Sequence, residues 1–408
     1  MQQLISWIDQ HLYSMSCDWY IKRLSRNDTL ANTTHQAGPY IPKSFMFHVL
    51  PDLHNEAILN PRVVLRTTIG GQTQRDVTAI WYNNKLFGQT RNEVRLTNFG
   101  GQESILLHPD STGSIAIFAF YGDVGDGQYG CDIWVSQSRE EEDYIQEVFG
   151  AIEPNTRHAV TLLRDGSSGD FRLLARPLEG CVLRADEIDE HWHEQFPSST
   201  HILHLVLRRR PFRQNHIDEL LMNRRECEYV LFQSIEEVIV KRRLERHFTT
   251  VHDFVAYAQT VLQRRKARSG RSLELHVHQL LQECGLQEDV HFSYNKVTKQ
   301  NKTPDFVFPS ARDYNDRTYP AHLLRMLAVK TTVKDRWRQI LHEADRIPMK
   351  HLLTLQEGVS DNQWLEMKEA GVVLVVPRPI QKFYPVHMRN DIVSLEEFVR
   401  LVRDGESE

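Results

Sequence analysis

The first half of the chain alternates short apolar runs with turn residues, a pattern typical of β-strands. Between residues 61 and 136, runs rich in Val, Ile, Thr and aromatic residues are separated by Gly-Gly, Asn-Asn and Gly-Asp-Gly clusters. The predicted strands cover residues 62–69, 77–82, 114–121 and 132–135. This spacing predicts a small β-barrel or β-sandwich, closed by an acidic helix over residues 140–149. An amphipathic helix is predicted before it, over residues 1–15, from the helical spacing of Leu4, Trp7, Ile8 and Leu12.

The second half has a different pattern, in which helices alternate with short buried strands. Apolar residues recur at helical intervals from residue 217 to about 247, and a further helix is predicted to begin at Ser272. Apolar strand-like runs then alternate with helical segments, and the last helix opens with a capping box at Ser394. This alternation is typical of an α/β domain.

The segment between these two halves has a mixed composition. Residues 154–215 combine Pro154, Pro177 and Pro197 with a Gly-Ser-Ser-Gly sequence, which is typical of a connection between domains. We therefore predict a mostly-β domain over residues 1–160, a linker region over residues 161–215 and an α/β domain over residues 216–408.

Composition narrows the class of protein. The 408 residues suffice for two or three domains, and the net charge of -5 means that any binding of nucleic acid must come from local clusters of charge. The five cysteines form no close pair, which argues against a disulfide framework or a zinc site and fits a reducing compartment. The polar amino-terminal segment and the lack of a long uncharged apolar run predict a soluble, cytoplasmic protein with no membrane contact.

Candidate catalytic residues lie between Lys302 and Glu343. Asp305 opens a short apolar strand, Lys330 ends the next strand, and Glu343 follows in a polar helical segment. Carboxylates are preferred ligands of Mg2+, and a lysine beside them can stabilise charge at an attacked phosphate. These residues are therefore the parts of a Mg2+-dependent phosphodiester hydrolase, with Asp305 and Glu343 as metal ligands.

The spacing of these residues leaves a second interpretation open. Nucleases usually keep an acid two residues before the lysine, and Ala328 stands at that position. The same residue types are also common where no metal binds. They then occur as an acid at the start of a strand, a lysine at the end of another strand and a glutamate on a solvated helix.

Three short segments have the residue types that bind DNA. A basic run over residues 264–271 could neutralise phosphates through Arg264, Arg265 and Arg268. In the next two segments, arginine and lysine can donate to guanine O6 and N7, while a carboxylate can accept from the amino group of cytosine. The residues concerned are Lys334, Asp335 and Arg336 in one segment, and Arg91, Glu93 and Arg95 in the other. Such charges also occur on ordinary solvated turns and helices.

Several segments of the chain resemble the EcoRII restriction endonuclease family. They are residues 20–29 and 87–95 in the first half, and residues 272–276, 302–311, 324–332, 334–345 and 351–360 in the second. The resemblance weakens between about residues 153 and 214. It implies an amino-terminal DNA-binding pseudobarrel, also seen in plant transcription factors, and a carboxy-terminal α/β domain of the PD-(D/E)xK restriction-endonuclease class. In that family the acid missing at Ala328 is supplied by the helix after the lysine strand, where Glu343 lies.

The resemblance also implies roles for single residues of the second half. Glu274 would belong to the catalytic group, and Tyr314 would be an auxiliary residue of the site. Arg225 and Tyr229 would prop open the DNA around the central base pair of the site. Residues 334–336 would read CC:GG.

In the first half, the resemblance implies a second arm that contacts effector DNA. Its residues would be Lys22, Arg23, His35 and Tyr40. The family has lysines where this chain has Gln89 and Val94, so we expect weaker binding of effector DNA.

The resemblance and the residues together predict a type II restriction endonuclease. It would cleave a CCWGG-like site in double-stranded DNA with Mg2+, act as a homodimer on two-fold symmetric DNA, and bind a second copy of the site through its amino-terminal domain. A cytosine DNA methyltransferase of matching specificity would be its functional partner. Two alternatives remain: a DNA strand transferase that uses Tyr314 covalently, and a sequence-specific DNA-binding regulator with an inactive nuclease domain.

Overall fold

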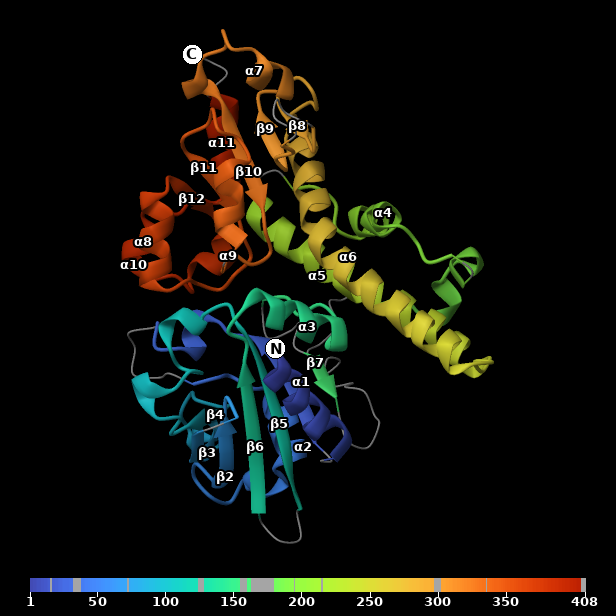
Figure 1. Cartoon of the computed structure of the whole chain (residues 1–408), viewed down its shortest axis with the longest axis vertical. Helices are drawn as coiled ribbons and strands as arrows, with labels where there is room; N and C mark the ends of the chain where they lie inside the picture. The colour runs from blue at the N-terminus through green and yellow to red at the C-terminus, as the bar shows by residue number, and fades with distance from the viewer. Residues whose placement is uncertain are drawn as a thin grey trace. The chain divides into compact units, whose positions relative to one another are not determined.

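The computed structural model describes residues 1–404 except 15–16, 32–37, 72, 124–127, 155–159, 163–179, 194, 214–215, 297–301 and 335. The chain divides into two compact units (Figure 1). Unit 1 contains Met1–Ala175, Gln356–Trp364 and Phe383–Pro385, and unit 2 contains Arg176–Leu355, Leu365–Lys382 and Val386–Glu408. The fold class is confirmed, because a mostly-β unit is followed by an α/β unit.

Unit 1 is built on a curled seven-stranded sheet with the strand order β4-β3-β2-β6-β5-β1-β7. The strands are β1 Asp18–Arg23, β2 Arg62–Ile69, β3 Thr73–Tyr82, β4 Glu93–Thr97, β5 Ile115–Asp123, β6 Gln128–Val135 and β7 Val160–Leu162. All pairs are antiparallel except β2 with β6, which is parallel. The four predicted runs fall on β2, β3, β5 and β6, whereas β1, β4 and β7 were not predicted as strands.

The sheet of unit 1 buries apolar residues on both faces. Successive residues of a strand point to opposite faces, so Phe118 and Phe120 of β5 join one core while Ile117 joins the other. Helix α2 (Lys43–Val49) contributes to the first core, and helices α1 (Gln2–Asp9) and α3 (Arg139–Phe149) contribute to the second. The predicted acidic helix is α3, whose first turn is capped by the Ser138 hydroxyl.

Unit 2 contains a five-stranded mixed sheet with the order β12-β11-β10-β9-β8. The strands are β8 Ser293–Tyr294, β9 Phe306–Phe308, β10 Arg325–Val329, β11 Lys350–Leu353 and β12 Val372–Val375. Strands β8, β9 and β10 are antiparallel to one another, and β10, β11 and β12 are parallel. The α-helices of this half of the chain are α4 Ser199–Arg209, α5 Ile217–Glu245, α6 Val251–Glu283, α7 Ala311–Asn315, α8 Asp361–Glu369, α9 Arg378–Gln381, α10 Val386–Arg389 and α11 Leu395–Asp404.

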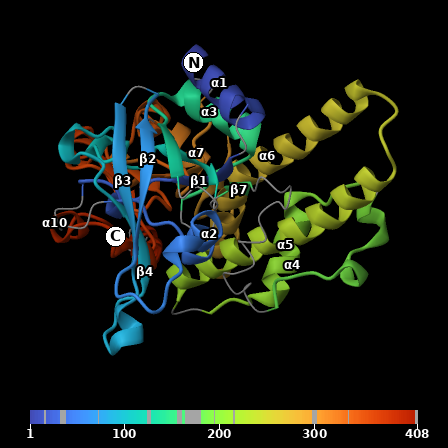
Figure 2. The ribbon, with the colours of Figure 1, turned by 90° about the horizontal axis from the view of Figure 1, so that it is seen from below.

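Helices α5 and α6 form a long hairpin, seen side by side in Figure 2. The prediction that a helix begins at Ser272 is wrong, because α6 begins at Val251 behind a capping box made by Thr250 and Asp253. The basic run 264–271 therefore lies inside the helix. The helix continues through Gly270, whose cost of about 1 kcal/mol relative to alanine is small beside the packing of α6 against α5.

The described part of the predicted linker region packs against the hairpin. Cys181, Ile202 and Val206 share an apolar core with Leu231 and Ile235 of α5. The expectation that the cysteines stay unpaired is wrong for one pair, because a disulfide joins Cys181 to Cys227, which lie 46 residues apart in the sequence. Separation along the chain does not report distance in the fold, so this pair had no signal in the sequence.

Among the described residues, no helix is both long enough and apolar enough to cross a bilayer.

Candidate active site

The antiparallel pairing of β9 with β10 brings the first catalytic pair together. Asp305 precedes β9 and Lys330 follows β10, and Phe306 is paired with Leu327, so the start of one strand and the end of the other lie at the same edge of the sheet. Lys330 Nζ lies 3.0 Å from Asp305 Oδ2. The same carboxylate oxygen accepts from the Val329 backbone N–H at 2.7 Å, which fixes its orientation.

Among the predicted catalytic carboxylates, Glu343 has the pKa that is shifted furthest from its ordinary value. It follows a 3-10 helix, Arg336–His342, where a helical segment was predicted. Burial raises its pKa to about 7, Lys330 opposes this rise, and Asp305 adds to it. Its Oε2 atom is buried and has no hydrogen-bond partner among the residues that the structure describes. An acceptor oxygen in this state favours the approach of a cation.

Glu274 of α6 lies close enough to Asp305 and Lys330 for their charges to act on its carboxylate. Burial and then the charge of Asp305 raise its pKa, while Lys330 lowers it. Its Oε2 atom accepts from the Tyr294 hydroxyl at 3.2 Å and from Asn295 Nδ2 at 3.4 Å. Tyr294 and Asn295 were not predicted as site residues, although their place just before the segment of Asp305 is a weak sequence signal.

Lys350 supports the turn that carries Glu343. Its side chain is 5% exposed, and its Nζ donates to the carbonyls of Ala344 and Ile347, each at 2.8 Å. Burial lowers the pKa of Lys350, while the charges of Asp345 and Glu343 raise it. A lysine that opens an otherwise apolar strand was the available sequence signal for this residue.

The residues fit the binding of Mg2+. Besides burial, the charge of Asp305 raises the pKa values of Glu274 and Glu343 while Lys330 lowers both, and Glu343 offers an oxygen that has no hydrogen-bond partner among the described residues. Among the described residues no group of three side chains is already arranged as a complete metal cage. Mg2+ needs no such cage, because it usually keeps several waters and takes one or two carboxylates from the protein. Asp305 and Glu343 are the residues that would hold it.

The other residues predicted near the active site have different surroundings. Lys334 and Arg336 are half-buried in the turn after β10, and Asp335 lies outside the described residues. Tyr314 is buried in α7, where Arg346 donates to its backbone carbonyl. In the ranges that the structure describes, no hydrogen bond joins Tyr314 to the catalytic pair.

Arg225 and its neighbours form a buried network on the α5–α6 hairpin. The Arg225 guanidinium donates to Glu228 at 2.9 Å and to the Ser272 hydroxyl. Arg268 also pairs with Glu228, at 3.0 Å, and its guanidinium stacks 5.0 Å from the centre of the Tyr229 ring. The structure thus brings together Arg225, Arg268 and Tyr229, which were all predicted to contact DNA. The charges of both arginines are already paired with Glu228.

Two arginines of the basic run that were predicted to contact phosphates have different partners within the protein. Arg265 pairs with Glu236 at 2.6 Å, so its charge is also balanced within the protein. Arg264 instead lies over the Phe196 ring, 5.0 Å from its centre.

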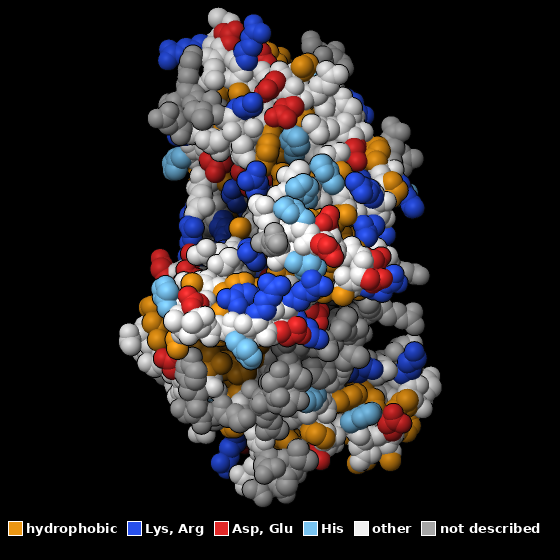
Figure 3. Space-filling view, turned by 90° about the vertical axis from the view of Figure 1, so that its right-hand side faces the viewer, with side chains coloured by type: hydrophobic (Ala, Val, Ile, Leu, Met, Phe, Trp, Pro, Cys, Tyr) orange, Lys and Arg blue, Asp and Glu red, His pale blue; other side chains and the backbone are white. Residues whose placement is uncertain are grey.

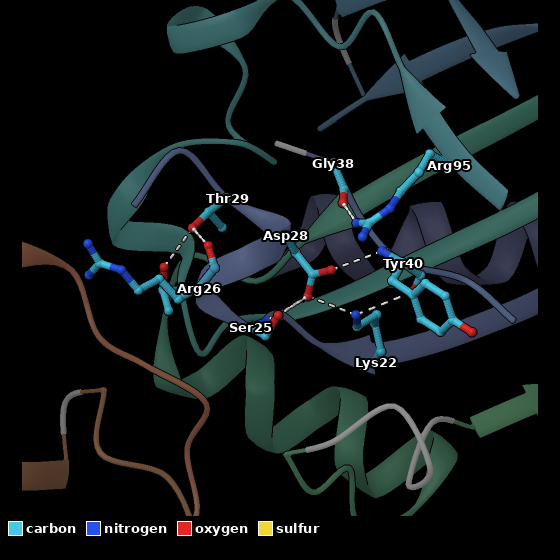
Figure 4. A network of polar contacts seen from close by, with 9 residues as sticks. Lys22, Ser25, Arg26, Asp28, Thr29, Gly38, Tyr40 and Arg95 are labelled. Carbon is cyan, nitrogen blue, oxygen red and sulfur yellow. Dashed lines mark hydrogen bonds and ion pairs between the residues drawn. The ribbon is translucent and has the colours of Figure 1, made fainter. Parts of the chain in front are cut away.

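In unit 1 the structure collects several predicted effector residues in one network (Figure 4). Arg95 lies beside the Tyr40 ring and donates to the Gly38 carbonyl at 3.2 Å. Lys22 Nζ lies 2.7 Å from Asp28 Oδ2 and 3.4 Å from the Tyr40 carbonyl. Lys22 is only 2% exposed, so its role here is to hold the Tyr40 segment rather than to meet a phosphate directly.

The loop residues that precede β4 join the same region. Glu93 accepts from Arg91 at 2.8 Å and from Arg95 at 3.2 Å, and the Arg91 guanidinium stacks 3.5 Å from the centre of the Tyr82 ring. The Arg91 and Arg95 side chains remain partly exposed, so their positive charges are accessible from solvent.

Two of the expectations for this region change with the structure. Arg23 points to the other core, where it is buried and pairs with Glu142 at 2.8 Å. Val94 is 1% exposed and belongs to the apolar core, so it could not carry a lysine that faces DNA. Of the two departures from the family pattern, only Gln89 lies at the surface. His35 lies outside the described residues.

Comparison with known proteins identifies the family. A model described as "Restriction endonuclease EcoRII, N-terminal" matches residues 14–161, and a model described as "EcoRII C terminal" matches residues 232–399. The type II restriction enzyme EcoRII of Escherichia coli is 39% identical over 404 residues, which cover 97% of each chain. This chain belongs to the EcoRII family. As a member of the EcoRII family, it is a type II restriction enzyme.

More distant relatives are also restriction enzymes. The type II restriction enzyme SsoII of Shigella sonnei is 25% identical over 144 residues, 34% of this chain and 46% of SsoII. A structure of metal-depleted Ecl18kI in complex with uncleaved, modified DNA has a TM-score of 0.44 and 17% identity, over 53% of this chain and 82% of that chain. Because this structural likeness is weak, the EcoRII assignment rests on the matches of sequence.

Replacement of Lys350 by methionine tests its support of Glu343. Methionine keeps the apolar stem but removes the donor to two carbonyls, so the turn of Glu343 loses its fixed position. We expect DNA cleavage to slow about 10- to 100-fold, the usual effect of losing a supporting partner of a metal ligand, with DNA binding unchanged. Lys368→Met is the matched control, because Lys368 makes an exposed ion pair with Asp391. Equal cleavage rates of K350M and K368M would contradict this role.

Proposed function

We propose that this enzyme hydrolyses both strands of double-stranded DNA at a CCWGG-like site, with Mg2+ as cofactor. The observation that carries the proposal is the cluster at one edge of the unit 2 sheet, where Lys330 lies 3.0 Å from Asp305 and Glu343 keeps a buried, unpartnered oxygen. The same residue types in one place are what metal-assisted phosphodiester hydrolysis requires. Membership of the EcoRII family supports the proposed site sequence.

Each protein group has a distinct task in this mechanism. When bound, Mg2+ supplies Lewis acidity toward the phosphate and its own bound water. Asp305 and Glu343 would hold the cation, and the backbone N–H of Val329 keeps Asp305 oriented. Lys330 places a positive charge beside the attacked phosphate and stabilises the negative charge that develops there. Glu274, held by Tyr294, adds a third carboxylate that positions water at the site.

Recognition of the site is proposed for the turn after β10 and for the α5–α6 hairpin. Lys334, Asp335 and Arg336 read consecutive G:C pairs, since lysine and arginine donate to guanine and aspartate accepts from cytosine. Arg225 and Tyr229 stack on the opened central base pair, which requires Arg225 to leave Glu228. Arg268 would then keep Glu228 paired. The enzyme acts as a homodimer on two-fold symmetric DNA, and a cytosine DNA methyltransferase of matching specificity protects the host site.

A second copy of the site is proposed to bind unit 1 as an effector. The exposed cations of Arg91 and Arg95, oriented by Glu93 and the Tyr40 segment, are the contacts with its phosphates and base edges. Binding of this copy stimulates cleavage by unit 2.

Substitution of Asp305 separates hydrolysis from covalent strand transfer. We expect Asp305→Ala to slow plasmid cleavage in Mg2+ at least about 1,000-fold, because an oriented metal ligand is lost, while specific DNA binding persists. Tyr314→Phe is the matched test of the alternative and should retain most of the activity. A Y314F enzyme that is inactive, with a wild-type enzyme that forms a covalent DNA adduct without divalent metal, would establish the strand transferase instead.

The raised pKa of Glu343 predicts a link between pH and the requirement for Mg2+. Below pH 7 the folded site holds Glu343 mainly protonated, and a proton must leave before the cation binds. The Mg2+ concentration for half-maximal cleavage should therefore rise about tenfold when the pH falls from 8 to 6. Initial rates over a Mg2+ titration at both pH values give the result. An unchanged requirement would show that Glu343 stays ionised or does not bind the metal.

Gln89→Lys tests the proposed binding of effector DNA to unit 1, because it adds a positive charge beside Arg91 and Arg95. Gln89 is exposed before β4, so a lysine there should tighten effector binding and steepen its dependence on salt by about 0.9 in log-log slope. The measurement is the effector DNA concentration that half-maximally stimulates cleavage, at several salt concentrations. Gln102→Lys adds the same charge at another exposed position of unit 1 and is the control. The same gain in Q89K and Q102K would refute a specific contact at residue 89.

A further inference from the structure

A cavity of about 160 Å³ lies on the α5–α6 hairpin, away from the residues assigned to catalysis. Its walls come from the last turns of α5, from the first half of α6 and from Trp192, His193 and Phe196. Four of its lining residues are arginines: Arg242, Arg243, Arg246 and Arg264. We call this cavity the arginine pocket.

Among the described residues, the positive charges of the arginine pocket are not paired with carboxylates. In the ranges that the structure describes, none of its four arginines lies within ion-pair distance of a carboxylate. The nearby Glu236 is already occupied, because both of its carboxylate oxygens accept from Arg265. Four guanidinium groups around one small cavity repel one another, so an anion from outside would stabilise them.

Aromatic rings hold two of these guanidinium groups in place. Arg243 lies 4.1 Å from the centre of the Phe248 ring, and Arg264 lies 5.0 Å from the centre of the Phe196 ring. Stacking fixes the plane of a guanidinium while its edge N–H groups stay able to bind phosphate oxygens in a fork.

Polar atoms without partners complete the wall. The Tyr257 hydroxyl and Nδ1 of His193 are both buried and have no hydrogen-bond partner in the part of the chain that the structure describes. A buried hydroxyl or imidazole without a partner is unfavourable, so a bound group with acceptor oxygens would satisfy Tyr257 as well as the arginines. The pocket therefore matches a phosphoryl group.

The size of the cavity limits what enters it. Sites that enclose a whole drug-sized ligand usually measure about 300–1,000 Å³, well above the 160 Å³ found here. One phosphodiester group with part of its sugar suits this volume, while the remainder of the ligand stays outside. A long polymer such as DNA can place one phosphodiester group in the cavity while the rest of the molecule stays outside.

Helix α6 carries a further exposed arginine between the arginine pocket and the active site. Arg271 follows Arg264 by seven residues, two helical turns along the same face, and its charge reaches Tyr294 of the active site. Glu274 follows Arg264 by ten residues, about 15 Å of helix, which is the length of about four to five base pairs. Figure 3, which shows the right-hand side of Figure 1, has a group of Lys and Arg side chains near the middle of that face.

We propose that the arginine pocket binds a backbone phosphate of the duplex that flanks the cleaved site. This inference rests on the proposed function, because it assumes that DNA occupies the active site at Glu274 and Asp305. A contact of this kind adds affinity without reading sequence. It makes the enzyme depend on the length of DNA beyond its recognition site.

The experiment compares duplexes that carry the site with flanks of 3 or 12 base pairs on each side. Binding to the full chain is measured without divalent metal, and cleavage is measured in Mg2+. We expect the wild-type enzyme to bind the long duplex about tenfold more tightly, with a steeper dependence on salt. The double variant R242Q/R246Q should lose this advantage and still bind and cleave the short duplex at the wild-type level.

The matched control is R208Q/K241Q, which removes two exposed charges of the helical part of unit 2 outside the pocket. It should keep the preference for long flanks. Equal loss in both double variants, or a wild-type enzyme indifferent to flank length, would overturn the proposal. Failure of the wild-type enzyme to cleave either duplex would instead overturn the proposed function.

Two further measurements separate other occupants. Calorimetric titration of the wild-type chain with inorganic phosphate and with AMP tests a free small anion, and binding of either that R242Q/R246Q abolishes, without a flank effect, would replace DNA as the ligand. Sedimentation of both double variants tests a protein partner. A change of oligomeric state in R242Q/R246Q alone would assign the pocket to a contact between copies of the chain.

Discussion

The ion pair between Lys330 and Asp305 is the interaction on which the active site depends. Burial and the negative charge of Asp305 raise the pKa values of Glu274 and Glu343, and the ammonium group of Lys330 lowers both. Antiparallel pairing of β9 with β10 makes the ion pair possible, because it places the beginning of one strand beside the end of the other. The geometry of the site therefore depends first on the register of the β9–β10 pairing and only then on the identity of each residue.

Burial determines which cations of this protein remain available to a ligand. Lys22, Arg23, Arg225 and Arg268 are all nearly inaccessible, and each is paired with a carboxylate. Removing a charge from water costs several kcal/mol unless a partner and hydrogen bonds offset it, so burial and pairing occur together. The arginine pocket differs from these sites, because its cations are at least partly exposed and two of them stack on aromatic rings instead. The same residue type thus stabilises the fold in one place and offers a binding surface in another.

The α5–α6 hairpin connects these two kinds of site. One end of α6 contributes Glu274 to the catalytic cluster, its middle carries the buried Arg268–Glu228 pair, and its first half lines the arginine pocket. A rigid helix fixes the distances between these three points. Contacts with DNA far from the cleaved bond can in this way be held in register with it.

Periodicity along the chain determined the two fold classes, the strands β2, β3, β5 and β6, and the position of α3, because alternation and capping are local properties. The pairing of Asp305 with Lys330 was also predicted, since each stands at the end of a short apolar run. Tertiary structure alone decided that Val94 faces a core, that Cys181 meets Cys227, that α6 continues through Gly270, and that Lys350 supports Glu343. These outcomes depend on which segments meet in space and on the desolvation that follows, and neither is encoded in the neighbours of a residue along the chain.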